Sequence, residues 1–156
     1  MLSGGIEIGG FVEERLHGRT VWVVDIPEVA RGELYFRQLF VNDERRQRPR
    51  WPQSGFCGIR KLAPGPEADS WKKGTNDRFH FHEGDIEAWH NLTDVELVLL
   101  QVWIESRLWL KSVDMKQQLA TFDRFSTSGL SADEKSGSAW FVENVYEALG
   151  EPGDWY

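Results

Sequence analysis

The stretch from Glu33 to Pro52, ELYFRQLFVNDERRQRPRWP, contains the clearest local fold signal in this sequence. Its first half, 34–41, is dense in aromatic and β-branched residues, which favour a pleated, half-buried strand. Asn42 and Asp43 tolerate left-handed backbone angles and therefore predict a tight turn. The return arm carries four arginines before it ends at Trp51-Pro52. We predict a β-hairpin at the centre of the domain, with one buried arm and one arginine-rich arm.

Strand and turn patterns continue along the rest of the chain. Segment 20–26 has apolar residues at both its odd and its even positions, which predicts a strand buried on two faces. The longest apolar run, 95–104, predicts a central strand. Short helical turns are expected at 84–89 and 145–149, and 63–77 reads as a surface loop. Further strands are expected at 7–12, 54–62, 78–82, 107–113, 118–125 and 140–142.

This pattern predicts an all-β fold, either a small antiparallel barrel or a compact sandwich with one or two short helical turns. A length of 156 residues suits a single domain with a real core. The net charge of −7 argues against a nucleic-acid or membrane partner, because both attract basic surfaces. The single Cys57 excludes an internal disulfide, and no signal peptide or membrane-spanning apolar run is present.

The hairpin sequence resembles a known motif. The string RQLFVNDERRQRPRWP (37–52) is similar to R-x-L-[FY]-V-N-G-x-R-x-x-x-A-R-x-P, a motif of the barrel domain inserted into right-handed parallel β-helix proteins such as glycoside hydrolase family 141. The chain departs from it at Asp43, where the family has Gly, and at Pro49, where it often has Ala.

Both ends of the chain extend the resemblance. The opening MLSGGIEIGGFVEE (1–14) resembles the rung that leads into the insertion, and FVENVYEALGEPGDWY (141–156) resembles the segment that returns to the β-helix. The resemblance implies that 15–142 is an inserted barrel and that 1–14 and 143–156 are exit and re-entry segments of a host β-helix lying side by side. It also implies an extracellular or periplasmic location for the parent protein.

Arg46, Arg48 and Arg50 would share one face of an extended strand that ends at Trp51. Such a row fits the uronates of an acidic polysaccharide, because a guanidinium matches a carboxylate in two parallel hydrogen bonds. The alternative is that these arginines pair with the domain's own carboxylates or with a host β-helix. Eight tryptophans either fill the core or face outward as platforms for sugars. The candidate ligand-binding residues are Arg46, Arg48, Arg50, Trp51, Trp71 and Trp89.

Catalytic and metal signals are weak in comparison. His80 and His82 share the face of a strand opposite Phe79 and Phe81, but no third ligand has a fixed spacing to them, so no metal or other cofactor is predicted. Carboxylates are too numerous to single out a catalytic pair, and no nucleophile motif is present. No residue is therefore assigned a catalytic role, and where the family hydrolyses glycosides the acids are expected on the β-helix.

These observations predict a non-catalytic domain that shapes or extends a polysaccharide-binding cleft in a β-helix carbohydrate-active protein. The expected partners are a plant-type polysaccharide or oligosaccharide, the host β-helix in the same chain, and a second copy through an exposed edge. One alternative is a purely structural or assembly insertion, and another is a part of a glycoside hydrolase that contributes to its active site.

Overall fold

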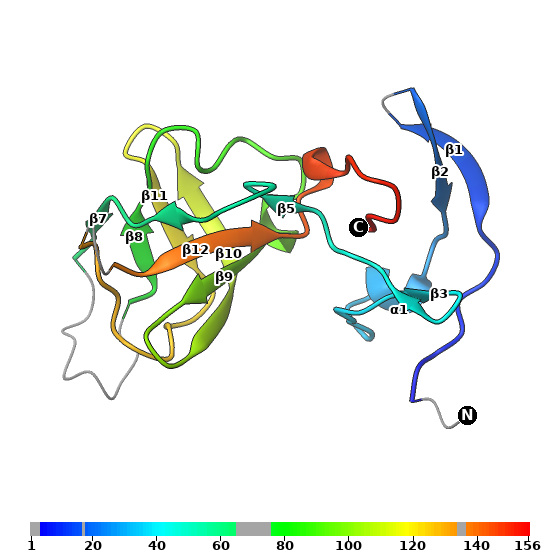
Figure 1. The fold of residues 1–156 in the computed structure, drawn as a ribbon, viewed down its shortest axis with the longest axis horizontal. Helices are drawn as coiled ribbons and strands as arrows, with labels where there is room; N and C mark the ends of the chain where they lie inside the picture. The colour runs from blue at the N-terminus through cyan, green and yellow to red at the C-terminus, as the bar shows by residue number, and fades with distance from the viewer. Residues whose placement is uncertain (1–3, 17, 65–75, 134–136) are drawn as a thin grey trace. The chain divides into compact units, whose positions relative to one another are not determined.

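The computed structural model describes residues 4–16, 18–64, 76–133 and 137–156. The chain divides into two compact units, Met1–Arg37 and Gln38–Tyr156. Strands dominate both units and the only helices among the described residues are single short turns, so the predicted all-β class is confirmed (Figure 1). None of the helices in the described part of the chain is long and apolar enough to cross a membrane.

The smaller unit is built on a two-stranded antiparallel hairpin of β1 (Val12–Leu16) and β2 (Arg19–Val23), followed by the helical turn α1 (Pro27–Ala30). The prediction that 20–26 is buried on both faces is wrong, since Trp22 is 65% exposed. Among the described residues β2 pairs only with β1, and a two-stranded ribbon has no second layer to cover its faces.

The predicted hairpin around Asn42 and Asp43 is present in the larger unit. It joins β3 (Phe40–Val41) to β4 (Glu44–Arg45), and the two turn residues have φ of 54° and 64°. The turn is confirmed, but the buried arm is wrong, because Phe40 is 56% exposed. This short hairpin pairs with no strand of the main sheet among the described residues, so its apolar side chains are not covered by that sheet.

The core of the larger unit is an antiparallel sheet of eight strands in the order β5-β12-β9-β10-β11-β8-β7, with β6 also paired to β12 (Figure 1). Consecutive strands pair along the β9-β10-β11 meander and between β7 and β8, whereas β12 pairs with β5, β6 and β9, and β11 with β8, across long separations in sequence. The strands are β5 (Arg50–Trp51), β6 (Cys57–Gly58), β7 (Lys61–Leu62), β8 (Arg78–His80), β9 (Glu96–Leu100), β10 (Glu105–Asp114), β11 (Leu119–Phe122) and β12 (Ala139–Glu143).

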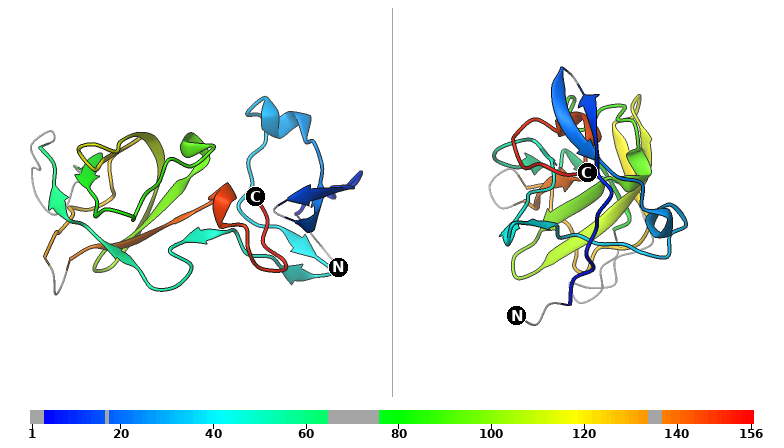
Figure 2. Two further views of the ribbon diagram at one scale, coloured as in Figure 1. Left: turned by 90° about the horizontal axis from the view of Figure 1, so that it is seen from above. Right: turned by 90° about the vertical axis from the view of Figure 1, so that its right-hand side faces the viewer.

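One continuous segment joins the two ends of this sheet. Within 57–62, β6 pairs with β12, the amide of Arg60 donates to the carbonyl of His80, and β7 pairs with β8. The sheet therefore curls around its interior towards a barrel, as the ribbon views show (Figures 1 and 2). The sheet stays open, with β5 and β7 at the two ends of its strand order.

The interior of the curled sheet is filled by aromatic and branched side chains. Phe79 lies with its ring centroid 5.2 Å from that of Phe122 and 5.4 Å from that of Trp140. Phe79 and Phe81 are both buried, as their alternation with His80 and His82 predicts. The remaining strand residues of this core are Leu97, Leu99, Leu108, Leu110, Ala120 and Val142.

The strand expected at 7–12 does not form, since 7–11 has no regular structure and β1 begins at Val12. Further predicted elements also differ from the structure. The apolar run 95–104 is not one strand: β9 ends at Leu100, a turn occupies 101–104, and β10 begins at Glu105. The predicted helical turn at 84–89 is irregular, because Gly84 has φ of 86° and the Asp85 side chain accepts a hydrogen bond from the amide of His82. Short 3-10 turns form instead at Leu92–Asp94 and at Tyr146–Ala148, the second within the predicted 145–149.

Candidate functional site

The arginines of the return arm do not form an exposed row in the structure. Arg48 is buried, whereas Arg46 and Arg50 are half-buried. Arg46 pairs with Glu44 at 3.2 Å, so its charge is neutralised within the β3-β4 hairpin. The candidate residues Arg46, Arg48 and Arg50 thus have three separate environments rather than one common face.

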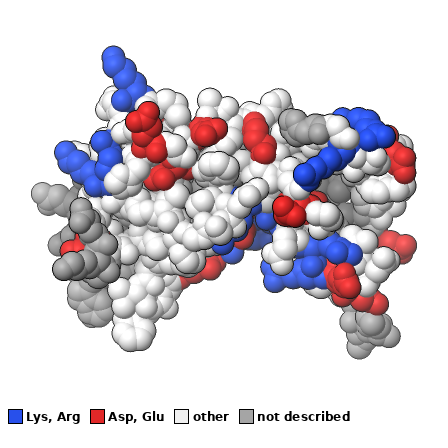
Figure 3. Space-filling view, turned by 45° about the horizontal axis from the view of Figure 1, so that its top comes forward, with Lys and Arg blue, Asp and Glu red and all other residues white. Residues whose placement is uncertain are grey.

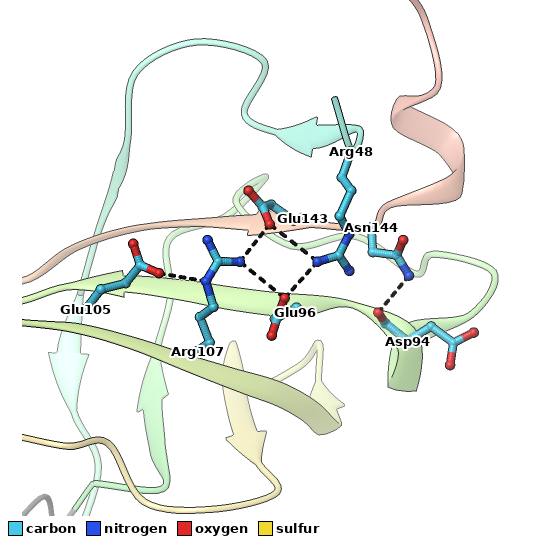
Figure 4. A network of polar contacts seen from close by, with 7 residues as sticks. All are labelled: Arg48, Asp94, Glu96, Glu105, Arg107, Glu143 and Asn144. Atoms are coloured by element: carbon cyan, nitrogen blue, oxygen red, sulfur yellow. Dashed lines mark hydrogen bonds and ion pairs between the residues drawn. The ribbon is translucent and has the colours of Figure 1, made fainter. Parts of the chain in front are cut away.

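Arg48 is part of a buried charge network with two carboxylates (Figure 4). Its Nη1 lies 2.7 Å from Oε2 of Glu96 and 3.4 Å from Oε2 of Glu143. Nη1 of Arg107 reaches the same two oxygens, at 3.2 Å for Glu96 and 2.8 Å for Glu143, while its Nε donates to Glu105. Two guanidinium groups therefore bridge two carboxylates, one of which, Glu96, is completely buried.

The sheet register explains why this network exists. Glu96 on β9 and Glu143 on β12 are directly opposite each other in the ladder. Like charges at such a position destabilise a sheet unless cations separate them. Burial alone would lower the pKa of the Arg107 guanidinium, but its hydrogen bonds and charge interactions with Glu143 and Glu105 outweigh this and raise it. The network ties β9, β10, β12 and the segment before β5 together.

The same contacts bear on catalysis. Glycoside hydrolysis needs two carboxyl groups facing a substrate, one of them held as an acid. The Oε2 atoms of Glu96 and Glu143 face guanidinium groups of this chain instead. The arrangement is chemically suited to cross-linking strands, not to acid–base work on a bound sugar.

Arg50 is held by backbone carbonyls and aromatic rings. Its Nε donates to the carbonyl of Pro52 and its Nη2 to that of Gly55, at 3.0 and 2.5 Å. The guanidinium carbon lies 4.0 Å from the ring centroid of Phe141, a distance typical of a cation–π contact. Arg50 therefore orders the 52–55 turn.

The three candidate tryptophans also differ in position. Trp51 is half-buried, and its indole Nε1 donates to the carbonyl of Gly84 at 3.3 Å. Trp89 is buried in the core and presents little ring surface to a ligand. Trp71 lies outside the described residues. The structure brings none of the described candidate tryptophans together with the arginines as one surface.

The two histidines considered as metal ligands, His80 and His82, have different surroundings. Nδ1 of His80 lies 3.0 Å from the carbonyl oxygen of Gln117, whereas His82 is an exposed residue after β8. The described residues contain no group of three or more His, Cys, Asp or Glu side chains that could hold a metal ion.

Cys57 lies on β6 and is not activated as a nucleophile. Burial, together with the charge and a hydrogen bond of Asp85, raises the pKa of its thiol to about 12, while Arg50 acts in the opposite direction. A thiol in this state holds little thiolate at neutral pH.

We expect the native protein to react with a thiol reagent such as DTNB much more slowly at pH 8 than the unfolded chain does, because the thiolate is the reacting form. Asp85→Asn should accelerate the reaction by removing a nearby negative charge, and Asp114→Asn, at the exposed end of β10, is the matched control. Equal rates for native and unfolded protein would contradict the assignment.

A surface site that the sequence did not predict lies at the β9-β10 turn. The turn presents three consecutive apolar side chains, Val102, Trp103 and Ile104, and Trp103 is 96% exposed. Of the large hydrophobic residues that the structure describes, Trp103 is the most exposed. Isolated exposed apolar residues are ordinary, but three in a row at a turn mark a contact surface.

A pocket of about 260 Å³ adjoins this turn. One wall is formed by the end of β9 and the β9-β10 turn, and the other by small residues from 128–131 and 137–139. The lining residues are Leu100, Gln101 and Val102, then Ser128, Gly129 and Ser131, then Gly137, Ser138 and Ala139.

Gln101 fixes the shape of the turn and the pocket wall. Its backbone amide donates to the carbonyl of Ile104 at 2.9 Å, which closes the turn. Its side-chain Nε2 donates to the carbonyl of Ser128 at 2.6 Å, and its Oε1 accepts from the hydroxyl of Ser106 at 2.7 Å. The turn that carries Trp103 is therefore bound to the 126–131 segment, and the pocket is pre-formed. A polar Gln inside an apolar run was the one sequence signal for this break.

The fold and this site define an all-β domain with an exposed aromatic turn beside a small pocket. Comparisons of the chain with protein-family models, curated proteins and solved structures gave no match. The resemblance to the barrel domain inserted in β-helix proteins therefore stays a proposal.

Proposed function

We propose that this domain is a non-catalytic carbohydrate-binding module whose binding surface is the β9-β10 turn and its adjoining pocket. The observation that carries the proposal is the almost complete exposure of Trp103 next to a pocket lined by hydroxyl, amide and backbone groups. Sugars offer apolar C–H faces that stack on an indole ring and hydroxyls that hydrogen-bond with such groups. Ligand sites commonly combine apolar surface with a few positioned polar groups in this way.

The placement of the arginines supports a binding surface at the turn rather than on the return arm. Arg48 is paired with Glu96, and Arg50 with backbone carbonyls and Phe141. Using either for a ligand would break contacts that hold the sheet. In the parent protein, we propose that this domain extends the polysaccharide-binding cleft of a host β-helix. The proposed partner is a plant-type polysaccharide, and the proposed location of the parent protein is extracellular or periplasmic.

Titration with oligosaccharides of xylan, pectin and other plant polysaccharides should quench tryptophan fluorescence for at least one of them. Trp103→Ala should weaken that binding by about thirtyfold or more, because loss of a central aromatic anchor costs about 2 kcal/mol or more. The matched control is Trp22→Ala, which removes another exposed indole from the smaller unit and should leave affinity unchanged. A panel without any binder, or equal affinity for the Trp103→Ala variant, would refute the proposed site.

A second candidate function is assembly, and a separate observation favours it. The β1-β2 hairpin of the smaller unit exposes Phe11, Val12 and Trp22, and a two-stranded ribbon leaves strand edges open. Such a surface suits contact with a host β-helix or with a second copy of the chain. Self-association is tested by comparing the molar mass from light scattering of the Trp22→Ala variant with that of the unsubstituted chain.

A further inference from the structure

Strand β2 of the smaller unit has an open edge. Among the described residues it pairs only with β1, and both strands are exposed along most of their length. Pairs in an antiparallel ladder alternate between hydrogen-bonded and non-hydrogen-bonded, and a hairpin with a two-residue connection closes on a hydrogen-bonded pair. The closing pair here is Leu16 and Arg19, so the backbone amides and carbonyls of Thr20 and Trp22 point away from β1. These groups can pair with a further strand.

The side chains favour the β2 edge over the β1 edge for such pairing. The β1 edge presents Glu13 and Arg15, and charged side chains on an edge strand protect it from pairing. The sequence of β2 is RTVWV and continues with Val24 and Asp25, so its centre is aromatic and β-branched. Trp22 in this centre is 65% exposed in a single copy, and a paired strand would cover part of its ring.

The segment 19–25, RTVWVVD, is complementary to itself when two copies run antiparallel with Trp22 opposite Trp22. The other facing pairs are then Val21 with Val23, Thr20 with Val24, and Arg19 with Asp25. Opposite charges therefore meet at both ends of the paired segment, an arrangement that stabilises a sheet. A shift of two residues in either direction places Arg19 or Asp25 opposite a valine instead.

The charges of the chain make a fixed register necessary for association. On the face shown in Figure 3, acidic and basic side chains form small groups of both signs. Two copies carry the same net charge of −7 and repel each other at long range, so association requires matched contacts. The opposite charges at the two ends of 19–25 supply such a match and fix the register, as complementary charges do at interfaces.

We infer that β2 is the interface of a two-fold symmetric dimer, in which 19–25 pairs antiparallel with the same segment of a second copy and the two ribbons form one four-stranded sheet. Because both copies use the same patch, the contact closes at two chains. A strand edge of this length buries less area than the roughly 1,200–2,000 Å² of stable interfaces, so we expect a weak dimer. This inference rests on the second candidate function, assembly, and names its partner; the Trp103 site takes no part in it.

Charge reversal tests the register. Sedimentation equilibrium of the whole chain at micromolar to submillimolar concentrations measures the dissociation constant of the dimer. Asp25→Arg places arginine opposite arginine and Arg19→Asp places aspartate opposite aspartate, so each variant alone should dimerise about tenfold or more weakly at low salt. In an equimolar mixture of the two variants every end pair has opposite charges again. Heterodimers should therefore form with nearly the affinity of the unsubstituted chain.

Glu13→Arg reverses a charge on the β1 edge of the same ribbon and is the matched control, which should leave the dimer unchanged. Circular dichroism checks that each variant keeps the fold. A chain that stays monomeric, reversal variants that dimerise as well as the unsubstituted chain, a mixture no tighter than its components, or assemblies larger than a dimer would each overturn the inference. Oligosaccharide binding by Asp25→Arg should equal that of the unsubstituted chain, so the carbohydrate-binding proposal stands or fails separately.

Discussion

Replacing Glu96 with glutamine is expected to lower the free energy of unfolding by about 3–5 kcal/mol, the usual cost of removing one partner from a buried ion pair. Glu96 has no solvent exposure, and its Oε2 lies 2.7 Å from Nη1 of Arg48 and 3.2 Å from Nη1 of Arg107. The neutral amide would remove the charge that faces the buried Arg48 guanidinium at 2.7 Å, whereas the ion pair with Glu143 is longer, at 3.4 Å. The expected loss is therefore mainly the cost of weaker charge compensation for a buried cation.

Urea denaturation followed by circular dichroism measures this loss. Glu105→Gln is the matched control, because Glu105 is exposed and its pair with Nε of Arg107 should contribute only about 0–1 kcal/mol. The double variant Arg48→Met with Glu96→Gln should recover part of the stability lost by Glu96→Gln alone, since the buried cation is then absent. A Glu96→Gln effect no larger than that of Glu105→Gln would show that the network does not stabilise the sheet.

This network shows where sequence reasoning reaches its limit. The alternation of Arg46, Arg48 and Arg50 indicates which residues would share a face, but not what that face meets. The partners of Arg48 are Glu96 and Glu143, which are 48 and 95 positions away in sequence. A carboxylate inside the apolar run VELVLL was the available clue, because a buried Glu requires a cation.

Features set by neighbouring residues were predicted correctly. The turn at Asn42 and Asp43 follows from backbone preferences of two residues, and the burial of Phe79 and Phe81 follows from strand alternation. The strands expected at 107–113 and 118–125 correspond to β10 and β11, which pair across a short connection. The position of β12 between β9 and the β5 and β6 strands depends on long-range pairing, which no local pattern contains.

The exposed turn escaped prediction because hydrophobicity alone does not distinguish a strand from a turn that uses apolar residues for contact. Val102, Trp103 and Ile104 extend the apolar run of β9 in sequence, yet Gln101 and its bond to Ser128 end the strand before them. Apolar residues that a fold leaves exposed in this way are better explained by a binding role than by a core role.

Among the described tryptophans, Trp140 lies in the core and Trp103 on the surface. We expect Trp140→Ala to reduce the free energy of unfolding by about 3–5 kcal/mol, the range for removing a large buried aromatic side chain. Trp140 is fully buried on β12, its ring centroid lies 5.4 Å from that of Phe79, and its Nε1 donates to the carbonyl of Gly58 at 3.0 Å. That hydrogen bond links β12 to β6, in the segment that joins the two ends of the sheet.

Urea denaturation of three variants tests this assignment. Trp140→Phe keeps most of the ring packing but loses the hydrogen bond to Gly58, so its loss should be smaller than that of Trp140→Ala and should remain measurable even where the alanine variant does not fold. Trp103→Ala removes the same side chain from the surface and should change stability by no more than about 0.5 kcal/mol. Similar losses for the Trp103 and Trp140 variants would contradict the placement of one indole in the core and the other in solvent, and with it the basis for assigning Trp103 to ligand binding.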